Sequence, residues 1–325
     1  MTGTFGDHPR KRVVREQWDT PLLRWVWERW GKRMFFYLGL PGPEALDIKL
    51  WRSMVSRVIA FELETESGNP RGNIVRLNRN LALMGVRHDV YCGAMEEVIL
   101  RKKDCDGKEF RINEAVTLYN LDFCNAITGS VKTAKGMRRL RFECLREIAV
   151  LQRALFRETG IRRFVLLMTC REDFHIEVVR SALAEAHIPR ITRDLVAMAG
   201  EPVASPKLPQ LGTNTKLLWA FVFTCLRECF RGQGISPIFM PPVIYKGCTA
   251  ASPMIHFVVV CTMAEENAAM PSDTQPLEAV HRLPILRADD GRILVVGSER
   301  EVEAVTDPTV FLAGFPCVVQ QESQG

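Results

Sequence analysis

The feature of this sequence that most restricts its fold is a regular alternation of short apolar segments with longer amphipathic ones. Five short apolar segments are expected to form strands, and they lie at 35–40, 57–61, 88–92, 116–119 and 163–169. Between them, apolar residues recur at helical spacing, as Ile74, Leu77 and Leu81 do. Strands separated by helices favour a mostly parallel sheet that is covered by helices on both faces.

The same patterns predict the remaining elements. We expect helices at 46–55, 74–84, 140–159, 174–187 and 215–231, with a short helix from Met95. Two closing strands are predicted, at 244–246 and 256–261, and a hairpin at 283–286 and 293–296. The predicted fold class is α/β: a doubly wound, mostly parallel seven-stranded sheet with helices on both faces, an N-terminal helix and a C-terminal extension.

The N-terminal region has two interpretations. Residues 1–20 are polar and are expected to be a loosely docked lead-in, with Thr20 capping a helix that begins at Pro21. That helix, at about 21–32, carries three tryptophans among basic residues. It either packs as a capping helix on the main domain or presents a basic, aromatic surface to nucleic acid or a protein partner.

Composition sets broad limits on function. Hydrophobic residues make up 47% and charged residues 25% of the 325 residues, and the net charge is +5, which is compatible with a nucleic-acid substrate but does not require one. Most of the ten cysteines stand singly in apolar runs and are expected to pack as small hydrophobic side chains. No paired-cysteine motif predicts a metal site, and no signal peptide or membrane span is found. These features favour a cytoplasmic protein.

The loops after the strands are where a doubly wound sheet binds ligands. After the first strand comes YLGLPGPEALD, residues 37–47, whose glycines allow a ligand to approach the backbone. The loop has neither the GxGxxG pattern nor a P-loop lysine, which disfavours a nucleoside triphosphate. Glu62 ends the second strand about twenty residues later, and its carboxylate suits a ribose diol. Glu64 is the alternative carboxylate at this position.

Taken in order, these segments resemble the class I S-adenosylmethionine-dependent methyltransferases over roughly residues 34–262. FYLGLPGP resembles the cofactor loop, VIAFE the ribose-binding strand, DVYCGAMEEV the third strand with the adenine-side loop, and VTLYNLDF the fourth strand with the catalytic loop. The closing strands fit the reversed final hairpin of that fold. The resemblance implies S-adenosylmethionine as cofactor, bound by Tyr37, Gly39, Pro41, Gly42, Glu62, Gly93, Ala94 and Met95.

Three departures from the family pattern stand out. Tyr37 holds a place that is usually acidic, although Asp47 lies downstream, and Ala94 replaces the acidic residue that contacts adenine. The catalytic loop lacks both prolines of a DPPY-type motif. The resemblance implies that Asn120 or Asp122 accepts hydrogen bonds from a target amino group while Phe123 stacks on the base. The alternative is a strand end capped by an Asx turn.

Two further features bear on the acceptor. A basic run after the catalytic loop includes Lys132, Lys135, Arg138 and Arg139, and it is either a phosphate-binding surface or an ordinary solvated face. Cys124 and Cys170 resemble, loosely, the cysteine pair of RNA cytosine-5 methyltransferases, with two buried thiols as the alternative.

The resemblance divides the chain into three regions: an N-terminal tail and helix at 1–33, a Rossmann-like methyltransferase domain at 34–265, and a C-terminal extension with a hairpin at 266–325. The function expected is transfer of a methyl group from S-adenosylmethionine to a nucleic acid or nucleotide-like substrate. The alternative is a catalytically inactive, methyltransferase-like binding or scaffold subunit of a larger assembly. The sequence leaves the oligomeric state open.

Overall fold

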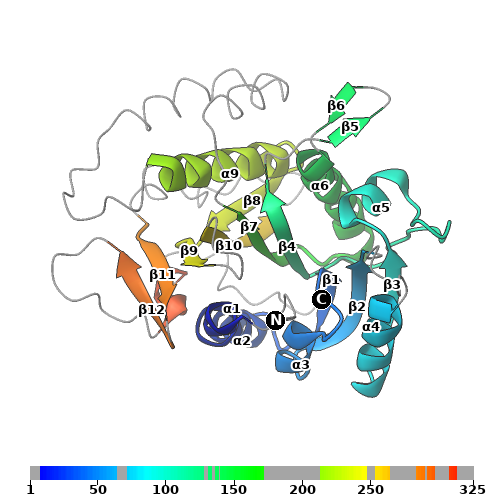
Figure 1. Ribbon diagram of the computed structural model, residues 1–325, viewed down its shortest axis with the longest axis horizontal. Helices are drawn as coiled ribbons and strands as arrows, with labels where there is room; N and C mark the ends of the chain where they lie inside the picture. The colour runs from blue at the N-terminus through cyan, green and yellow to red at the C-terminus, as the bar shows by residue number, and fades with distance from the viewer. Residues whose placement is uncertain are drawn as a thin grey trace.

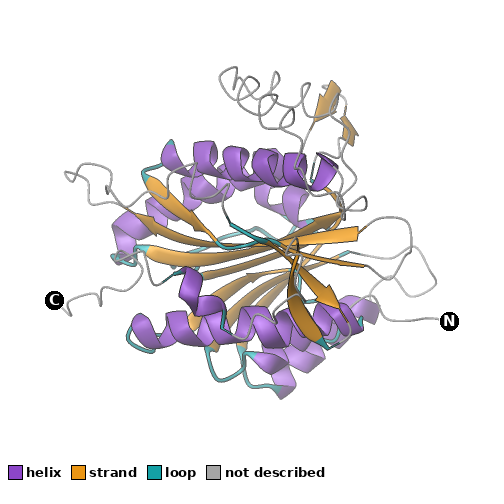
Figure 2. Ribbon diagram, turned by 90° about the vertical axis from the view of Figure 1, so that its left-hand side faces the viewer, coloured by secondary structure: helices purple, strands orange, loops and turns teal. Residues whose placement is uncertain are grey.

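The computed structural model places one large sheet between two layers of helices (Figures 1 and 2). It describes residues 8–63, 72–127, 131–133, 136–138, 140–171, 213–246, 253–263, 283–289, 291–296 and 307–312. Among these, no helix is long and apolar enough to cross a membrane.

Five parallel strands form the first part of the sheet, in the order β3-β2-β1-β4-β7. They are β1 (Phe35–Gly39), β2 (Val55–Glu62), β3 (Arg87–Cys92), β4 (Leu118–Ala126) and β7 (Arg163–Arg171). The next strand, β10 (Pro253–Met263), runs antiparallel to β7, as the predicted reversed final hairpin requires.

The rest of the sheet corrects the predicted strand count, because the sheet has ten strands and is partly antiparallel. Beyond β10 lie β8 (Ile235–Phe239) and β9 (Val243–Lys246), which pair with different parts of β10. Pro241 and Pro242 separate them, since proline has no N–H for a ladder. The predicted hairpin, β11 (Ile285–Asp289) and β12 (Arg292–Val296), then extends the sheet through β9.

Helices cover both faces. On one face lie α1 (Pro9–Val14), the π-helical turn η1 (Arg15–Asp19), α2 (Thr20–Arg29), α3 (Leu46–Leu50) and α4 (Gly72–Leu83). On the other lie α5 (Met95–Arg101), α6 (Leu140–Thr159) and α9 (Thr213–Arg231). A separate hairpin, β5 (Val131–Thr133) with β6 (Gly136–Arg138), and the 3₁₀ turn η2 (Pro308–Phe311) complete the described elements.

Alternation along each strand explains the two layers. In β4, Leu118 packs with the N-terminal helices, whereas Tyr119 and Leu121 pack under α5, α6 and α9. Successive side chains of a strand point to opposite faces, so an apolar run supplies both layers at once. Each large apolar side chain buried in this way contributes about 1.5–3 kcal/mol.

The N-terminal expectation was wrong in its boundaries. The chain is helical from Pro9 to Arg29, and the Thr20 hydroxyl donates to the Arg15 carbonyl (2.6 Å) instead of capping a new helix. Trp18 is fully buried and packs in the core cluster of this face. The tryptophans of α2 are partly buried against the same cluster, in agreement with a capping helix. An apolar face already begins before Pro21, and it holds this segment against the sheet.

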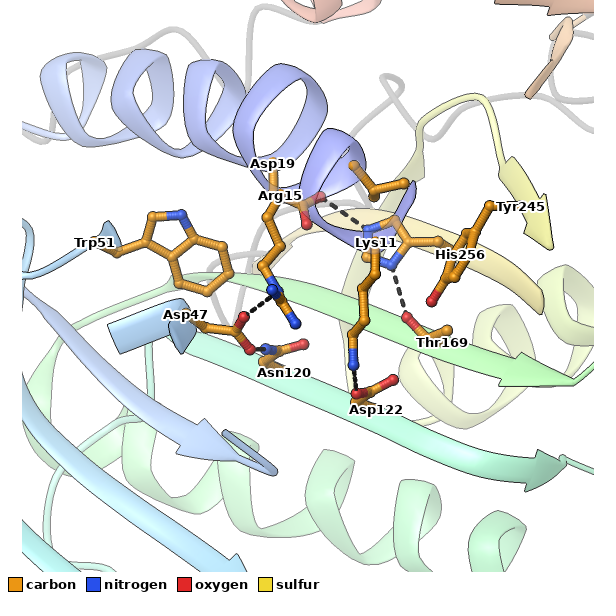
Figure 3. Close-up of a pocket in the computed structure, with 11 residues that line it drawn as sticks. Lys11, Arg15, Asp19, Asp47, Trp51, Asn120, Asp122, Thr169, Tyr245 and His256 are labelled. Atoms are coloured by element: carbon orange, nitrogen blue, oxygen red, sulfur yellow. Dashed lines mark hydrogen bonds and ion pairs between the residues drawn. The ribbon is translucent and has the colours of Figure 1, made fainter. Parts of the chain in front are cut away.

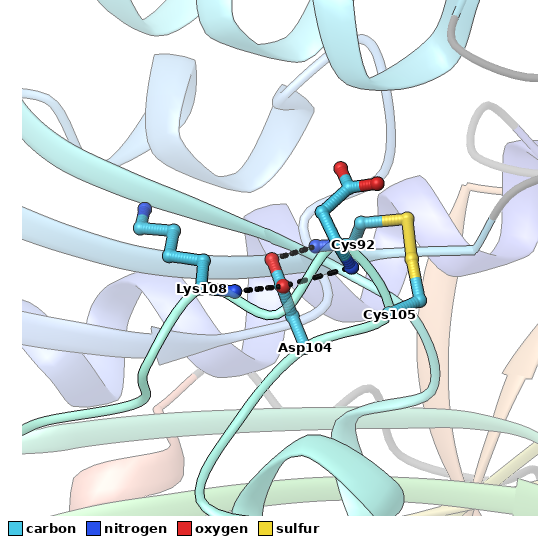
Figure 4. The surroundings of a disulfide bond; sticks show 5 residues. Cys92, Asp104, Cys105 and Lys108 are labelled. Atoms are coloured by element: carbon cyan, nitrogen blue, oxygen red, sulfur yellow. Dashed lines mark hydrogen bonds between the residues drawn. A yellow bond between two sulfur atoms is a disulfide. The ribbon is translucent and has the colours of Figure 1, made fainter.

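One cysteine expectation was also wrong, because Cys92 and Cys105 form a disulfide (Figure 4). Cys92 ends β3, and the loop after α5 returns so that the Cys105 N–H donates to the Cys92 carbonyl (3.0 Å). The Asp104 carboxylate accepts from the Cys92 and Lys108 N–H groups and holds this loop in place. The remaining described cysteines are free thiols, most of them buried as predicted: Cys144, Cys170, Cys225, Cys229 and Cys261.

Two predicted elements have the wrong length, because the helix predicted at 46–55 ends at Leu50 and the strand predicted at 116–119 continues to Ala126, whereas most of the others agree to within a few residues. The helix predicted at 140–159 is α6, and that at 215–231 is α9. The helix predicted at 174–187 lies outside the described residues. How the chain divides into domains stays a prediction.

Candidate functional site

The candidate site lies where β1 stands between β2 and β4, at the carboxyl ends of these strands. The strand order reverses at this point, and such switch points form ligand crevices in open α/β sheets. Gly39, the last residue of β1, pairs with Ala60 on one side and Asn120 on the other. A Cβ on Gly39 would lie 2.2 Å from the Asn120 carbonyl oxygen, so β4 can approach β1 only beside a glycine.

The β1–β3 half of the site comprises the loop Gly39–Gly42, Glu62 and Gly93–Met95. Gly42 adopts a positive φ of 65°, and no atom lies within 4 Å of where its Cβ would be. Glu62 ends β2 half-buried, and burial raises the pKa of its carboxyl to about 7, against hydrogen bonds from Asn73 and the Leu63 backbone. The Gly93 N–H donates to the Glu62 carbonyl (2.9 Å), so the structure brings the predicted ribose and adenine residues together.

Two predicted cofactor residues face away from this half. The Met95 side chain is buried in the core cluster beneath α5, so only its backbone borders the loop. Tyr37 is also fully buried, and its hydroxyl accepts a hydrogen bond from the Asn120 amide (3.2 Å) on the other side of β1. Burial raises the pKa of Tyr37 well above its ordinary value, so its hydroxyl stays neutral.

The residues of the β1–β3 half fit the predicted cofactor. Glu62 offers a carboxylate that can accept from both hydroxyls of a ribose, and a Cβ on Gly42 would meet no atom within 4 Å. The contribution of each residue to a ligand stays a prediction.

The β4–β10 half has a different character, because the N-terminal helix fills it (Figure 3). Lys11 on α1 pairs with Asp122 of β4, and Arg15 on η1 pairs with Asp47 of α3. The Asn120 amide donates to the same Asp47 carboxylate (2.6 Å). Burial raises the pKa of Asp47, while Arg15 and Lys11 act against that shift. We treat Asp47 as ionised, since a guanidinium and an amide both bind its oxygens.

A second chain of polar contacts runs beside the first. The His256 ring of β10 contacts Asp19 through Nε2 (2.8 Å) and the Thr169 hydroxyl through Nδ1 (2.8 Å). All three residues are buried. Tyr245 of β9 lies next to them, and burial raises the pKa of its hydroxyl well above the ordinary value. Both ring nitrogens of His256 therefore have a polar partner, and the Tyr245 hydroxyl stays neutral.

The space left in the β4–β10 half is small. The cavity among these residues measures about 20 Å³, enough for about one water molecule. No nucleoside or peptide side chain fits there while α1 is docked. The polar groups of this half are therefore satisfied by the chain itself.

The predicted catalytic residues are only partly brought together. Asn120 and Asp122 lie on the same face of β4, toward α1. Phe123 lies on the opposite face, 3% exposed, in the core cluster with α5 and α6, and the Arg141 guanidinium carbon is 5.4 Å from its ring centre. Its predicted stacking role would require it to leave that layer. The Asx-turn alternative does not describe this region, because β4 continues through both residues.

The structure describes the remaining candidate residues, those of the basic run and the two cysteines, only in part. Lys132 and Arg138 lie on β5 and β6, with side chains outside the described atoms, and Lys135 and Arg139 lie outside the described residues. The Cys170 thiol is buried in the apolar cluster, as the alternative interpretation predicts, and the Cys124 side chain is not among the described ones. Sequence reasoning missed Lys11, Arg15, Asp19 and His256 entirely.

Comparisons with known proteins find only distant structural similarity. No family model matches the chain, and no curated protein matches it. A solved structure similar to it is the S-adenosylmethionine-dependent methyltransferase from Agrobacterium tumefaciens, at 12% identity and a TM-score of 0.37, covering 80% of this chain and 64% of that one. The chain thus spans less than two thirds of that protein's length.

Two further structures show the same level of likeness. One is a proposed RNA methyltransferase from Pyrococcus horikoshii (10% identity, TM-score 0.36, covering 82% of this chain and 92% of that one). The other is a protein of the NADB-Rossmann superfamily from Streptococcus agalactiae (10% identity, TM-score 0.31, covering 75% and 70%). Likeness at this level does not bear on activity, so the function is inferred below from the chain's own strands and side chains.

Proposed function

We propose that this chain is an S-adenosylmethionine-dependent methyltransferase that binds its cofactor in the β1–β3 half of the site. The observation that supports this best is the half-buried Glu62 carboxylate at the switch point of a sheet ordered β3-β2-β1-β4-β7-β10 with β10 reversed. That strand order agrees with the fold implied by the motif resemblance. A half-buried carboxylate beside the crevice is suited to a diol, which can donate two hydrogen bonds to it.

Each residue of this half has a simple role in the proposal. Glu62 orients the ribose, and the Gly39–Gly42 loop lets the ligand lie against the backbone. Gly93–Met95 would border the adenine, and the disulfide holds the neighbouring loop. When bound, S-adenosylmethionine supplies an electrophilic methyl group on a sulfonium. The protein's own part is to align the acceptor with that methyl group and to keep water away from it.

The acceptor proposed from the sequence is a nucleic acid or a nucleotide-like molecule. Asn120 and Asp122 would bind the target amino group, and the basic run around β5 and β6 would contact phosphates. This part of the proposal rests on the motif resemblance and on the position of the basic run after the catalytic loop. It is tested by supplying RNA, DNA and protein pools with tritiated S-adenosylmethionine and measuring which pool is labelled.

Cofactor binding is tested separately by thermal unfolding with S-adenosylmethionine or S-adenosylhomocysteine. A ligand at a hundred times its Kd stabilises a protein by about 2.7 kcal/mol, a shift that is easily measured. We expect both compounds to stabilise the wild type and Glu28→Gln, which changes an exposed glutamate on α2, but not Glu62→Ala. Stabilisation that persists undiminished in Glu62→Ala would rule out this site.

One observation favours a second candidate, a binding or scaffold subunit without catalysis. Lys11 and Arg15 occupy the carboxylates next to the proposed acceptor position, as a permanently closed site would require. A protein that binds S-adenosylmethionine but labels none of the three pools, even with α1 released by mutation, would fit this candidate.

A further inference from the structure

We propose that the β4–β10 half is an acceptor subsite for the lysine side chain of a basic peptide, and that the chain's own segment 9–15 occupies it with Lys11 in the lysine position. The proposal rests on the cofactor part of the proposed function, and it competes with the nucleic-acid acceptor for the same residue, Asp122. It replaces a polyanionic acceptor with a cationic one. Four features of the described residues support it.

The first feature is the charge of the surface beneath α1. Apart from the N-terminal segment, the described residues that line this cavity contribute two carboxylates, Asp47 and Asp122, and neither a lysine nor an arginine. The others are uncharged or aromatic, with His256 as the single histidine: Trp51, Asn120, Thr169, Tyr245 and His256. Such a surface attracts a cation and repels phosphate.

The second feature is how closely a cationic segment already fits that surface. The side chains of Lys11 and Asp122 are only 16% and 14% exposed, and those of Arg15 and Asp47 are 9% and 6% exposed. Pairs as buried as these are retained only when both charges are matched in position, since an unmatched buried charge costs several kcal/mol. The subsite therefore selects both the sign and the position of the charge.

The third feature is the composition of the occupant. The segment 9–15 reads PRKRVVR, so Lys11 stands between two arginines. Arg10 lies 3.7 Å from Asp289 at the end of β11, which adds a contact beside the lysine position. The 20 Å³ cavity leaves no room for a second amine. An outside peptide can therefore enter only when this segment leaves.

The fourth feature is the distance from the subsite to the cofactor loop. The Leu40 N–H donates to the Asn120 carbonyl (3.0 Å), which joins the loop Gly39–Gly42 to the end of β4. Asp122 follows two residues later on the same strand face. An amine held by Asp122 thus lies beside the half that would hold the methyl donor.

The reaction requires two steps, a proton transfer and a displacement. The ammonium first gives a proton to the Asp122 carboxylate, which passes it to water. The nitrogen lone pair then forms a bond to the methyl carbon as the bond from that carbon to the sulfonium sulfur breaks, and the sulfur keeps the electron pair as a neutral thioether. Asp122 acts here by holding the amine in line and accepting its proton.

The test is peptide binding to a protein whose internal lysine has been removed. A fluorescent peptide with the sequence of residues 8–16 is titrated by anisotropy into the wild type, Lys11→Ala, and Lys11→Ala combined with Asp122→Asn. Arg24→Ala, which removes an exposed cation of α2, is the matched control. A peptide with alanine at the lysine position and a short single-stranded RNA serve as competing probes. Lys11→Met keeps most of the side-chain volume if Lys11→Ala does not fold.

Lys11→Ala removes one of the two ion pairs that hold the segment on the sheet, so the segment should leave more often. Because a tethered competitor acts at millimolar effective concentration, we expect this variant to bind the peptide about tenfold more tightly than the wild type or Arg24→Ala. The Asp122→Asn double variant and the alanine peptide should lose that gain. Tighter binding of the RNA than of the peptide to Lys11→Ala, or no gain in peptide binding, would overturn the proposal. A lysine-bearing peptide that binds but gains no methyl group in the presence of bound S-adenosylmethionine would also overturn it.

The cofactor and acceptor proposals fail in different ways in these measurements. If S-adenosylmethionine stabilises the protein but the peptide does not bind Lys11→Ala, only the acceptor subsite is wrong. If the peptide binds through Asp122 and no cofactor stabilises the protein, the cofactor proposal is wrong and the peptide site remains.

Discussion

The two halves of the carboxyl edge differ in what satisfies their polar groups. In the β1–β3 half, Glu62 carries a carboxyl whose pKa is raised by burial, and none of the described lysines or arginines is paired with it. In the β4–β10 half, Asp47 and Asp122 each receive a cation from the N-terminal helix. The first half therefore gains by binding a ligand that donates hydrogen bonds to Glu62. In the second half the N-terminal helix already supplies the donors. One edge of one sheet thus combines a proposed cofactor site with a region that the N-terminal helix fills.

The largest effect is expected at Gly39, where the two halves meet. Gly39→Ala drives a Cβ to 2.2 Å from a backbone oxygen of β4, so the strands must separate, and we expect a loss of about 5 kcal/mol in unfolding free energy. In Gly42→Ala, in the same loop, the new Cβ contacts no atom, and only the positive φ is unfavourable. We expect this variant to lose about 1 kcal/mol of unfolding free energy. Denaturant unfolding of both variants measures the difference. Equal losses would show that β1 and β4 are not tightly joined here.

The next largest difference between the halves is expected when one carboxylate is removed from each. Asp47→Ala removes the carboxylate that pairs with the buried Arg15 guanidinium, and we expect it to lower the unfolding free energy by about 3–4 kcal/mol. Glu62→Ala removes an unfavourably buried carboxyl and should leave stability unchanged or slightly raised. Thermal unfolding without ligand measures both. A larger loss in Glu62→Ala than in Asp47→Ala would reverse the comparison.

Reduction of the disulfide should weaken the β1–β3 half selectively. Cys92 and Cys105 are 13 residues apart, and closing a loop of this size stabilises a protein by about 3 kcal/mol. Dithiothreitol should lower the melting temperature of the wild type and reduce its affinity for S-adenosylmethionine, but peptide binding by Lys11→Ala should not change. In Cys105→Ser the reductant should have no further effect. A wild-type melting temperature that does not respond to reductant would exclude this stabilisation.

The smallest effect concerns pH. The folded pKa of Glu62 is about 7, above the ordinary 4.5, so the folded state binds this proton more tightly than the unfolded state. Stability from this group is complete below about pH 4.5 and is lost as pH rises toward 7. With allowance for its partial exposure, the change is about 1–2 kcal/mol. Urea titrations at pH 5 and pH 8 measure this change in unfolding free energy, and Glu62→Gln should not show it. If Glu62→Gln shows the same change as the wild type, another group is responsible.

Cofactor binding should depend on pH in the opposite sense. A ribose diol donates to the ionised carboxylate, so affinity for S-adenosylmethionine should rise between pH 6 and pH 8 in the wild type. Calorimetric titration at the two pH values checks this, and Glu62→Gln is the control.

The parts of the fold with local signals were predictable from sequence. The helix at 140–159 was predicted with the observed ends, because its buried residues recur at helical spacing within one segment. β8 was missed, because Pro237 interrupts its pattern and only pairing with β10 makes it a strand. The helical start at Pro9 was missed for a similar reason, since its apolar side chains are buried by strands far along the chain.

The residues of the candidate site also differ in whether a local sequence pattern reveals them. Glu62 was identifiable because a carboxylate at a strand end, about twenty residues past a Gly/Pro loop, is a pattern within one segment. His256 gave no such signal, because it stands alone in an apolar strand and its partner Thr169 lies 87 residues earlier. Lys11 resembles any other residue of a basic run, and Asp122 lies 111 residues away. Contacts between such distant residues arise only when the sheet assembles.

The contact between Asp19 and His256 has a consequence for the order of events during synthesis. The two residues are 237 positions apart, so the helix that carries Asp19 is synthesised well before the strand that carries His256. At about 5–20 residues per second, roughly 10–50 seconds pass before β10 is made. Throughout that interval the emerging chain carries a basic helix without its docking surface. The buried contact that fixes this helix to β10 can therefore form only after the strands between them have been made.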